Sequence, residues 1–312
     1  MILRRLAARH ALEAVLLLTC AVLAAVAPEF LTRANLWNVL RSVAEIGIIA
    51  CGMTLVIVAG EIDLSVGSQV AFAGCLTAVL VASGLPVGLA AAAALAAGAL
   101  IGAAMGSLRA TLGVPTFITS LAGLTILRGG ALKLTGGFPL TPFPEGYAFL
   151  GSGRLAGIPL AVLVFGGVAV AVHVLKDHTA FGRAVHAIGA NAEAARLSAL
   201  PIVRVRILAL ALTGALAALS GVLLSSRLLS GNPTVAAGWE LDVIAAVIVG
   251  GTSLSGGQGS VRGTILGVLF VGVLVNGMRL LDVQEDAQLV ARGALVLLAV
   301  LWTRLQPDDR RA

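Results

Sequence analysis

The chain has 312 residues, of which 59% are hydrophobic and 12% charged, and its mean hydropathy is +1.03. Soluble domains carry roughly 45–50% apolar residues, glycine included, and about 25% charged residues, so this composition excludes a water-soluble protein and makes lipid the solvent for most of the chain. The net charge of +6 does not indicate a nucleic-acid partner, because the basic residues cluster in particular loops, as is typical of membrane orientation.

Ten apolar runs approach the roughly 20 residues that cross a ~30 Å hydrocarbon core as a helix. They predict an all-α, polytopic membrane protein with about ten transmembrane helices in a single domain, residues 1–312. The runs lie at about 11–27, 38–60, 64–82, 85–107, 115–134, 158–176, 207–227, 240–253, 261–281 and 286–304. The run 115–134 contains Arg128 and Lys133, and the run 240–253 is short, so both are expected to be broken or partial helices. Small residues such as Gly98 and Gly102 predict close helix packing.

The basic residues predict the orientation of these spans. Ten crossings place both termini on one side, and thirteen of the 21 Lys and Arg fall on that side, against four on the other. Because cytoplasmic loops carry an excess of Lys and Arg, both termini and the polar segment 176–206 are predicted to be cytoplasmic. The basic start followed by the run 11–27 is also compatible with a signal peptide, and orientation does not decide between the two interpretations.

The three cysteines, Cys20, Cys51 and Cys75, all lie inside apolar runs. They show neither a disulfide framework nor the spacing of a metal site. We interpret them as small core residues and predict no metal site and no catalytic residue.

The segment Gly60-Glu61-Ile62-Asp63-Leu64-Ser65-Val66-Gly67-Ser68 places two carboxylates between two spans. A charged residue at the centre of a membrane helix costs roughly 2.5–3.5 kcal/mol on insertion scales, so such residues are functional candidates. Alternatively, Asp63 or Ser65 caps the helix that starts at 64–66. The candidates for the gate and translocation path are Asp63, Ser65, Gly67, Gln69 and Asn276, with Thr119 and Ser120 as further polar residues inside spans. Hydrogen bonding between helices is the alternative role for each.

The segment 249–260 contains LSGGQ, the signature pentapeptide of ABC-type ATPases. A nucleotide site also needs a GxxxxGK(S/T) loop, and the two lysines, Lys133 and Lys176, each follow a leucine. The glycines are therefore expected to let the backbone turn tightly between two spans. Leu64-Ser65-Val66-Gly67 parallels Leu254-Ser255-Gly256-Gly257, which hints at an internal duplication.

The polar segment 176–206 is predicted to hold a short helix. Asn191 can cap a helix over 192–200, with Glu193 in its first turn, and Pro201 would stop it. Residues 179–183 and 188–190 are expected to form turns before it. We favour a docking helix for a cytoplasmic partner. The alternative is an amphipathic helix on anionic headgroups.

Three segments carry a resemblance to a known family: GEIDLSVGS (60–68), FGRAVHAIGANAEAARLSAL (181–200) and GGTSLSGGQGSVRGTILG (250–267). Together they resemble the hallmark segments of permease subunits of ribose-type ABC sugar importers. The resemblance implies a fold like that of vitamin-B12 importers and a location in the bacterial inner membrane. It implies four kinds of partner: a second permease, identical or different, the lipid bilayer, cytoplasmic ATPases that use ATP and Mg, and a periplasmic sugar-binding protein.

The same resemblance implies a coupling loop at about 177–206 that contacts the ATPase. Its residues here are Gly182, Arg183, Gly189, Asn191, Glu193, Ala194, Ala195 and Arg196. Glu61 departs from the family pattern, in which glycine is usual. The chain is thus expected to be a transport subunit that is not an enzyme and binds no cofactor itself. The competing interpretation is an ion-coupled carrier that uses Asp63 and Glu61.

Overall fold

The computed structural model describes residues 11–141, 143–144 and 146–305. The predicted cytoplasmic position of the basic residues in 1–10 and 306–312 therefore lies outside the described residues. In the described part the regular structure is almost entirely helical, which confirms the all-α class. The strands described are β1 (Arg154–Leu155) and β2 (Ile158–Pro159), which pair antiparallel in a small hairpin.

A helix occupies each of the ten predicted ranges. These helices are α2 (Ala11–Val26), α3 (Arg33–Val58), α4 (Val66–Ala82), α5 (Val87–Leu112), α6 (Thr116–Thr135), α8 (Leu160–His178), α11 (Ile202–Leu228), α12 (Trp239–Val249), α13 (Val261–Leu280) and α14 (Glu285–Leu305). Three further described helices lie between them: α7 (Ala148–Ser152), α9 (Ala180–Ala190) and α10 (Ala192–Leu197). Among the described residues, six helices have the length and composition that a membrane crossing needs: α3, α5, α6, α8, α11 and α13.

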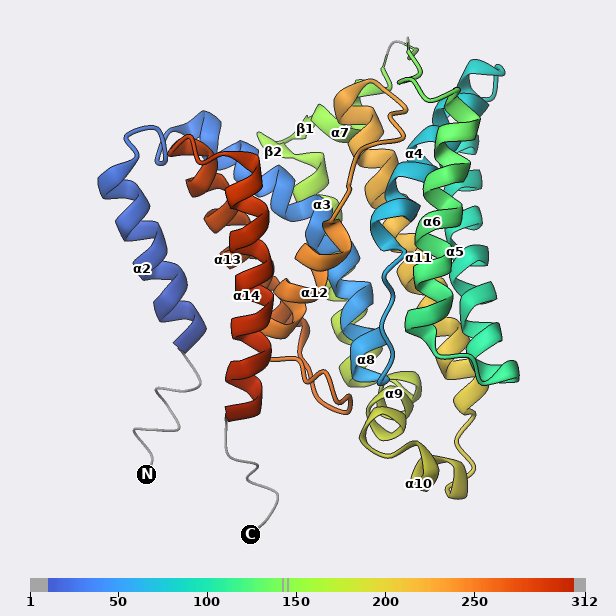
Figure 1. Ribbon diagram of the computed structural model, residues 1–312. Coiled ribbons are helices and arrows are strands. Elements are labelled where there is room, and N and C mark those ends of the chain that lie inside the picture. Colours follow the sequence, from blue (N-terminus) through green and yellow to red (C-terminus); the bar gives the residue numbers. More distant parts are fainter. Residues whose placement is uncertain (1–10, 142, 145, 306–312) are drawn as a thin grey trace.

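The long helices form one bundle, in which α11 packs along α5, α4 and α3. In Figure 1, α4, α5 and α6 lie on one side of the bundle, α2, α13 and α14 lie on the other, and α3, α8 and α12 run between them. Helices α9 and α10 lie beyond the ends of the long helices, on the side where α2 begins and α14 ends (Figure 1).

Small residues allow the backbones of α5 and α11 to meet. A Cβ atom on Gly98 would lie 2.4 Å from the carbonyl oxygen of Gly214, and one on Gly102 would lie 2.1 Å from that of Leu210. Any larger side chain would force the helices apart. The close packing expected from Gly98 and Gly102 is thus confirmed.

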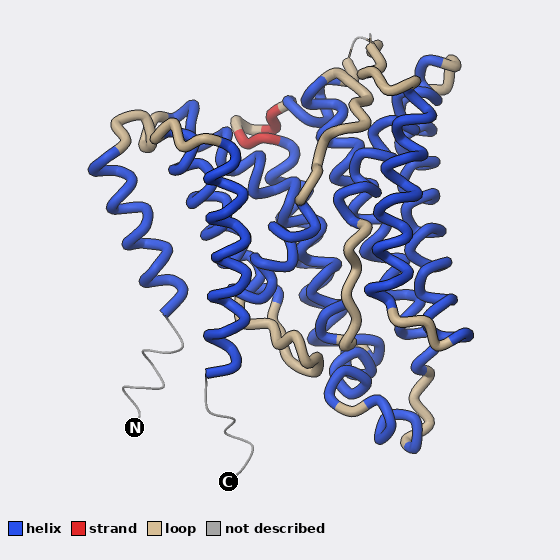
Figure 2. Tube along the Cα trace, in the orientation of Figure 1, coloured by secondary structure: helices blue, strands red, loops and turns tan. Residues whose placement is uncertain are grey.

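Two of the ten predicted spans are interrupted. Helix α12 has 11 residues, and the loop before it descends into the bundle, while the loop before α4 rises into the bundle from the opposite end (Figure 2). The prediction of a partial helix at 240–253 is confirmed. The prediction of a break within 115–134 is wrong, because α6 is continuous over Thr116–Thr135.

Arg128 explains why α6 tolerates a charge. Its Nη1 donates hydrogen bonds to the carbonyl oxygens of Pro233, at 2.6 Å, and Val235, at 2.8 Å. These carbonyls belong to the loop before α12, where no helix supplies them with donors. The charge in α6 therefore compensates for the interruption of another span, a relation that the local sequence could not reveal.

Candidate functional site

The segment between α8 and α11 holds the residues of the predicted coupling loop. The predicted range 177–206 is trimmed at both ends, because α8 continues to His178 and α11 begins at Ile202. The turns predicted at 179–183 and 188–190 are wrong. Residues Ala180–Ala190 form helix α9, and its first turn is capped by Thr179 Oγ1, which accepts from Gly182 N at 3.2 Å. Val185 and Ile188 are buried against Val58 and Ala59. This apolar contact stabilises helix despite the two glycines.

Helix α10 follows the predicted capping. Asn191 Oδ1 accepts a hydrogen bond from Ala194 N at 3.0 Å, which confirms the cap. The helix ends at Leu197 rather than at Leu200. Ala199 has a left-handed backbone with φ of +56°, and Leu200 N donates to Ala195 O at 3.1 Å. This closing turn ends the helix before Pro201 restricts the backbone.

The outer surface of α10 combines charge with an apolar side chain. Glu193 and Arg196 are each 66% exposed and pair with one another at 2.6 Å. The hydrogen bond from Arg196 holds the pKa of Glu193 below its ordinary value. Leu197, a residue that the sequence analysis did not single out, is 76% exposed beside them. Arg183 on α9 and Ala194 are also exposed, whereas Ala195 is buried. We call Arg183, Glu193, Arg196 and Leu197 the docking surface.

The three motif segments, far apart in sequence, meet behind this surface. A Cβ atom on Gly256 would lie 2.8 Å from the carbonyl oxygen of Gly189 and 3.1 Å from the Cα of Gly60. Gly256 has a φ of +81°, a left-handed conformation that glycine adopts without strain. The predicted tight turn in the LSGGQ segment is thus present, and it packs against α9.

Hydrogen bonds reinforce this junction of the three segments. Gly257 N donates to Val58 O at 2.8 Å, and His186 Nδ1 lies 3.0 Å from Gly257 O. One contact comes from the end of α3 and the other from α9. Gly257 of the α12–α13 loop is therefore bonded both to the end of α3 and to α9, and Gly189 of α9 packs against Gly60 at the start of the α3–α4 loop.

In the sequence, Lys176 marks the start of the polar segment 176–206 and lies outside any nucleotide-binding loop, and the structure gives it a specific structural role. Its side chain is 2% exposed and ion-paired with Asp177. Its Nζ donates to the carbonyl oxygen of Gly259 at 3.0 Å, which joins the end of α8 to the LSGGQ loop. No local pattern distinguishes this lysine from a solvated one, because its acceptor lies 83 residues away.

Lys176→Met should lower the unfolding temperature of the purified protein in detergent. The change keeps the aliphatic stem but leaves the Gly259 carbonyl without the Lys176 donor, and Asp177 keeps only His173 as a partner. An unsatisfied buried group costs about 1–3 kcal/mol. Lys133→Met is the matched control, since Lys133 is exposed on α6 and its replacement should leave the unfolding temperature nearly unchanged. Equal unfolding temperatures for the two variants would show that Lys176 does not anchor the loop.

Four of the five predicted path residues gather where α4 begins. Asp63 Oδ1 accepts from Ser65 N at 2.8 Å and from Ser65 Oγ at 2.6 Å, and Ser65 Oγ accepts from Gln69 Nε2 at 2.8 Å. All three side chains are buried. Ser65 occupies the N-cap position, but its side chain accepts no capping bond. The predicted cap is therefore replaced by a turn in which Asp63 binds the residue before the helix.

Gly67 lets the start of α12 approach the start of α4. A Cβ atom on Gly67 would lie 2.3 Å from Glu240 Oε2 and 2.5 Å from the carbonyl oxygen of Ala236. The two interrupted spans thus touch inside the bundle, one entering from each end. Ser120, on α6, also lies beside the loop before α4, with its Oγ 3.4 Å from the carbonyl oxygen of Ile62.

Two other polar candidates lie apart from this group. Asn276 exchanges hydrogen bonds with Asn35, at 2.7 Å and 3.0 Å, and so joins α13 to α3. Thr119 Oγ1 donates to the carbonyl oxygen of Thr116 within its own helix. The sequence allows two roles for Asn276, part of the path or a hydrogen bond between helices. The structure shows the hydrogen bond between helices.

Asp63→Ala should destabilise the protein more than Asp63→Asn. Alanine leaves the buried N–H and O–H of Ser65 without their acceptor, at about 1–3 kcal/mol, whereas asparagine retains an oxygen at the Oδ1 position. The check is the unfolding temperature of both variants in detergent. An alanine variant as stable as the asparagine variant would contradict the assigned role of the turn.

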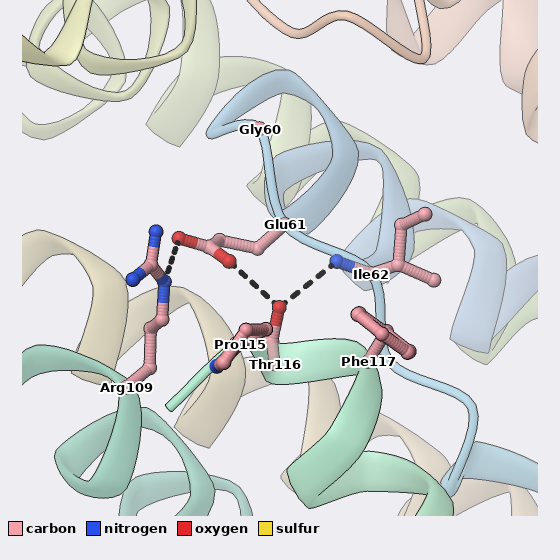
Figure 3. A pocket seen from close by; sticks show the side chains of 7 residues that line it. All are labelled: Gly60, Glu61, Ile62, Arg109, Pro115, Thr116 and Phe117. Carbon is pink, nitrogen blue, oxygen red and sulfur yellow. Dashed lines mark hydrogen bonds and ion pairs between the residues drawn. The ribbon is translucent and has the colours of Figure 1, made fainter. Parts of the chain in front are cut away.

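Glu61 lies at the foot of the loop before α4 and is 6% exposed. Its Oε1 is 2.9 Å from Arg109 Nε and 2.8 Å from Arg206 Nε, and its Oε2 accepts from Thr116 Oγ1 at 2.6 Å. Beside it lies a pocket of about 210 Å³, lined by Gly60, Glu61, Ile62, Arg109, Pro115, Thr116 and Phe117 (Figure 3). The sequence marked Glu61 as unusual but identified none of its partners. Among the described residues, no group of three or more His, Cys, Asp and Glu is placed to hold a metal ion.

Comparison with known proteins places the chain in a family. The family model described as "Branched-chain amino acid transport system / permease component" matches residues 35–300. The chain belongs to this permease family. The permease is 46% identical over 279 residues to the ribose import permease protein RbsC of Bacillus subtilis, covering 89% of this chain and 87% of that protein. No solved structure matches it significantly.

Two further relatives come from Escherichia coli. The probable ABC transporter permease protein YphD is 45% identical over 305 residues, covering 96% of the permease and 91% of the relative. The L-arabinose transport system permease protein AraH is 38% identical over 300 residues, with coverage of 96% and 90%. The resemblance to ribose-type ABC permeases, based on three motif segments, is thereby confirmed.

Proposed function

We propose that this permease forms the membrane path of an ATP-driven importer for a monosaccharide or a similar small polar solute. Its relatives are named as ribose and L-arabinose permeases, which supports this class of solute. Cytoplasmic ATPases would supply the energy from ATP and Mg, a periplasmic binding protein would deliver the solute, and a second permease, identical or different, would complete the path. The permease itself would bind no cofactor and catalyse no covalent step.

The observation that carries the proposal is the docking surface and its connection to the candidate path. Glu193, Arg196 and Leu197 project from α10 at one end of the bundle. Helix α9, next to α10, contacts Gly60 and Gly256 through Gly189. The loop that starts at Gly60 leads to Asp63 and Ser65. A partner that moves α9 and α10 would therefore displace the loop that carries the candidate gate.

The membrane arrangement is part of the proposal. All ten helices would cross or enter the bilayer of the bacterial inner membrane, in a fold of the vitamin-B12-importer type formed by the single domain 1–312. Both termini would be cytoplasmic, as would α9 and α10. The described ends of the chain support this, because α2 begins and α14 ends on the side where α9 and α10 lie (Figure 1).

Reconstitution tests the proposed function. Proteoliposomes that hold the permease and its ATPase, with the binding protein outside and ATP inside, should accumulate radiolabelled ribose or another pentose, and should not when ATP is replaced by ADP. A proton or sodium gradient should not replace ATP. Uptake driven by an ion gradient without ATP would favour the ion-coupled carrier and contradict the proposal.

A further inference from the structure

The charge cluster at Glu61 joins parts of the fold that the proposed mechanism needs to move together. Arg206 lies in the second turn of α11, which begins directly after the segment that carries α9 and α10. Glu61 lies two residues before Asp63 and four before Ser65 in the α3–α4 loop. The ion pair between Arg206 and Glu61, at 2.8 Å, is therefore a second connection from the docking surface to the candidate gate. It does not involve Gly189.

The cluster is built to keep a carboxylate in a protein interior. A buried charge is stable only where partners replace its hydration, and Glu61 has two arginines and a hydroxyl within 3 Å. Arg109 belongs to the last turns of α5, Thr116 begins α6, and Arg206 belongs to α11. One side chain thus holds the ends of three helices and the start of the loop to α4.

Removing the carboxylate would leave two guanidinium groups close together without a counter-charge. Like charges repel at short range, and weak screening in a partly buried site increases the effect. The side chain of Arg206 is 14% exposed and that of Arg109 is 27% exposed. The adjoining pocket (Figure 3) leaves space beside Arg109 and Glu61, so the cluster can rearrange without first opening a packed core.

We infer that Glu61 is a positioning residue for transport: its carboxylate couples displacement of α11 at Arg206 to displacement of the loop that carries Asp63 and Ser65. The inference rests on the proposed function and adds a residue that neither lines the candidate path nor belongs to the docking surface. This role differs from that of an ion pair that only stabilises the fold. A stabilising pair changes how much folded protein is present, whereas a coupling pair changes how much solute enters for each ATP hydrolysed.

The test measures that ratio in proteoliposomes for Glu61→Gln, Arg206→Gln and the double variant. Glutamine keeps the shape of Glu61, and its amide oxygen can still accept from Thr116. Its NH2 group then replaces the oxygen that faces Arg109 and Arg206, so the negative charge and the acceptor for the two arginines are lost together. We expect solute imported per ATP hydrolysed to fall about fivefold or more in each single variant, the lower end of common coupling effects. The double variant should be no worse than the single variants, because both remove the same interaction. The ratio is independent of the amount of folded protein.

Glu13→Gln is the matched control, since Glu13 also pairs with an arginine, Arg262, at 3.3 Å, and Arg262 is 78% exposed. Its ratio should equal that of the unmodified permease. Unchanged ratios for both Glu61→Gln and Arg206→Gln, beside ATP-driven uptake by the unmodified permease, would overturn the inference alone. Absence of ATP-driven uptake by the unmodified permease would overturn the proposed function and this inference with it. Should Glu61→Gln fail to fold, Arg206→Gln decides alone, because Glu61 then keeps Arg109 as its counter-ion.

Discussion

Gly189→Ala is expected to prevent the permease from folding with α9 in place. The added methyl carbon would lie 1.7 Å from the carbonyl oxygen of Val58 and 2.6 Å from the backbone nitrogen of Gly257. Both neighbours are backbone atoms, so no side-chain rotation can relieve the clash. Overpacking a rigid interior typically costs about 1–3 kcal/mol, and occasionally more, and we expect the upper end here. The unfolding temperature and the monodisperse yield in detergent should both fall.

Gly166→Ala provides the comparison for that result. Gly166 lies in α8, and a Cβ atom there would meet no atom within 4 Å, so the same chemical change should leave the unfolding temperature unchanged or slightly raised. If Gly189→Ala were as stable as Gly166→Ala, the contact of α9 with the end of α3 and with Gly257 would not exist as described.

Arg196→Glu is expected to uncouple the permease from the proposed ATPase partner while leaving it folded. Arg196 is exposed and pairs only with Glu193 on its own helix among the residues that the structure describes, and exposed pairs contribute little to stability. Reversing its charge places two carboxylates on the docking surface. ATP-driven uptake should fall about tenfold or more, as for the loss of a central interface residue, with an unchanged unfolding temperature. Glu193→Lys should have the same effect.

The charge-swapped variant Glu193→Lys with Arg196→Glu separates two explanations. It restores the ion pair within α10 but reverses the charges presented to a partner. Continued loss of uptake would locate the effect at the partner interface, whereas recovery would show that the pair acts only within its own helix. Normal uptake and full stimulation of the ATPase in both single variants would contradict docking at this surface.

Local patterns in the sequence were sufficient for much of the fold. A helix occupies each of the ten apolar runs, and the short run 240–253 correctly indicated the partial helix α12. The cap at Asn191 was also predictable, because a cap depends on residues within one turn. Helix α9 was missed because its glycines resemble turn residues. The packing of Val185 and Ile188 onto the end of α3 determines its conformation, and that contact is distant in sequence.

The contacts of the candidate site could not be predicted for the same reason. Glu61 is paired with Arg109 across 48 residues, and Lys176 is bonded to Gly259 across 83. Arg128 was expected to interrupt α6, yet it serves the carbonyls of a loop more than 100 residues away. In each case the sequence identifies a charge that needs compensation, and only the tertiary structure shows where the compensation comes from.

The contact among Gly60, Gly189 and Gly256 has a mechanical consequence. Where side chains separate two moving elements, they can change rotamer and accommodate a displacement of a few tenths of an ångström. Here main chain meets main chain, and a Cβ atom at Gly189 or Gly256 would lie within 3 Å of a neighbouring backbone atom. Protein interiors at such packing density have low compressibility. The junction is therefore hardly compressible, and a small displacement of α9 should displace both the α3–α4 loop and the α12–α13 loop.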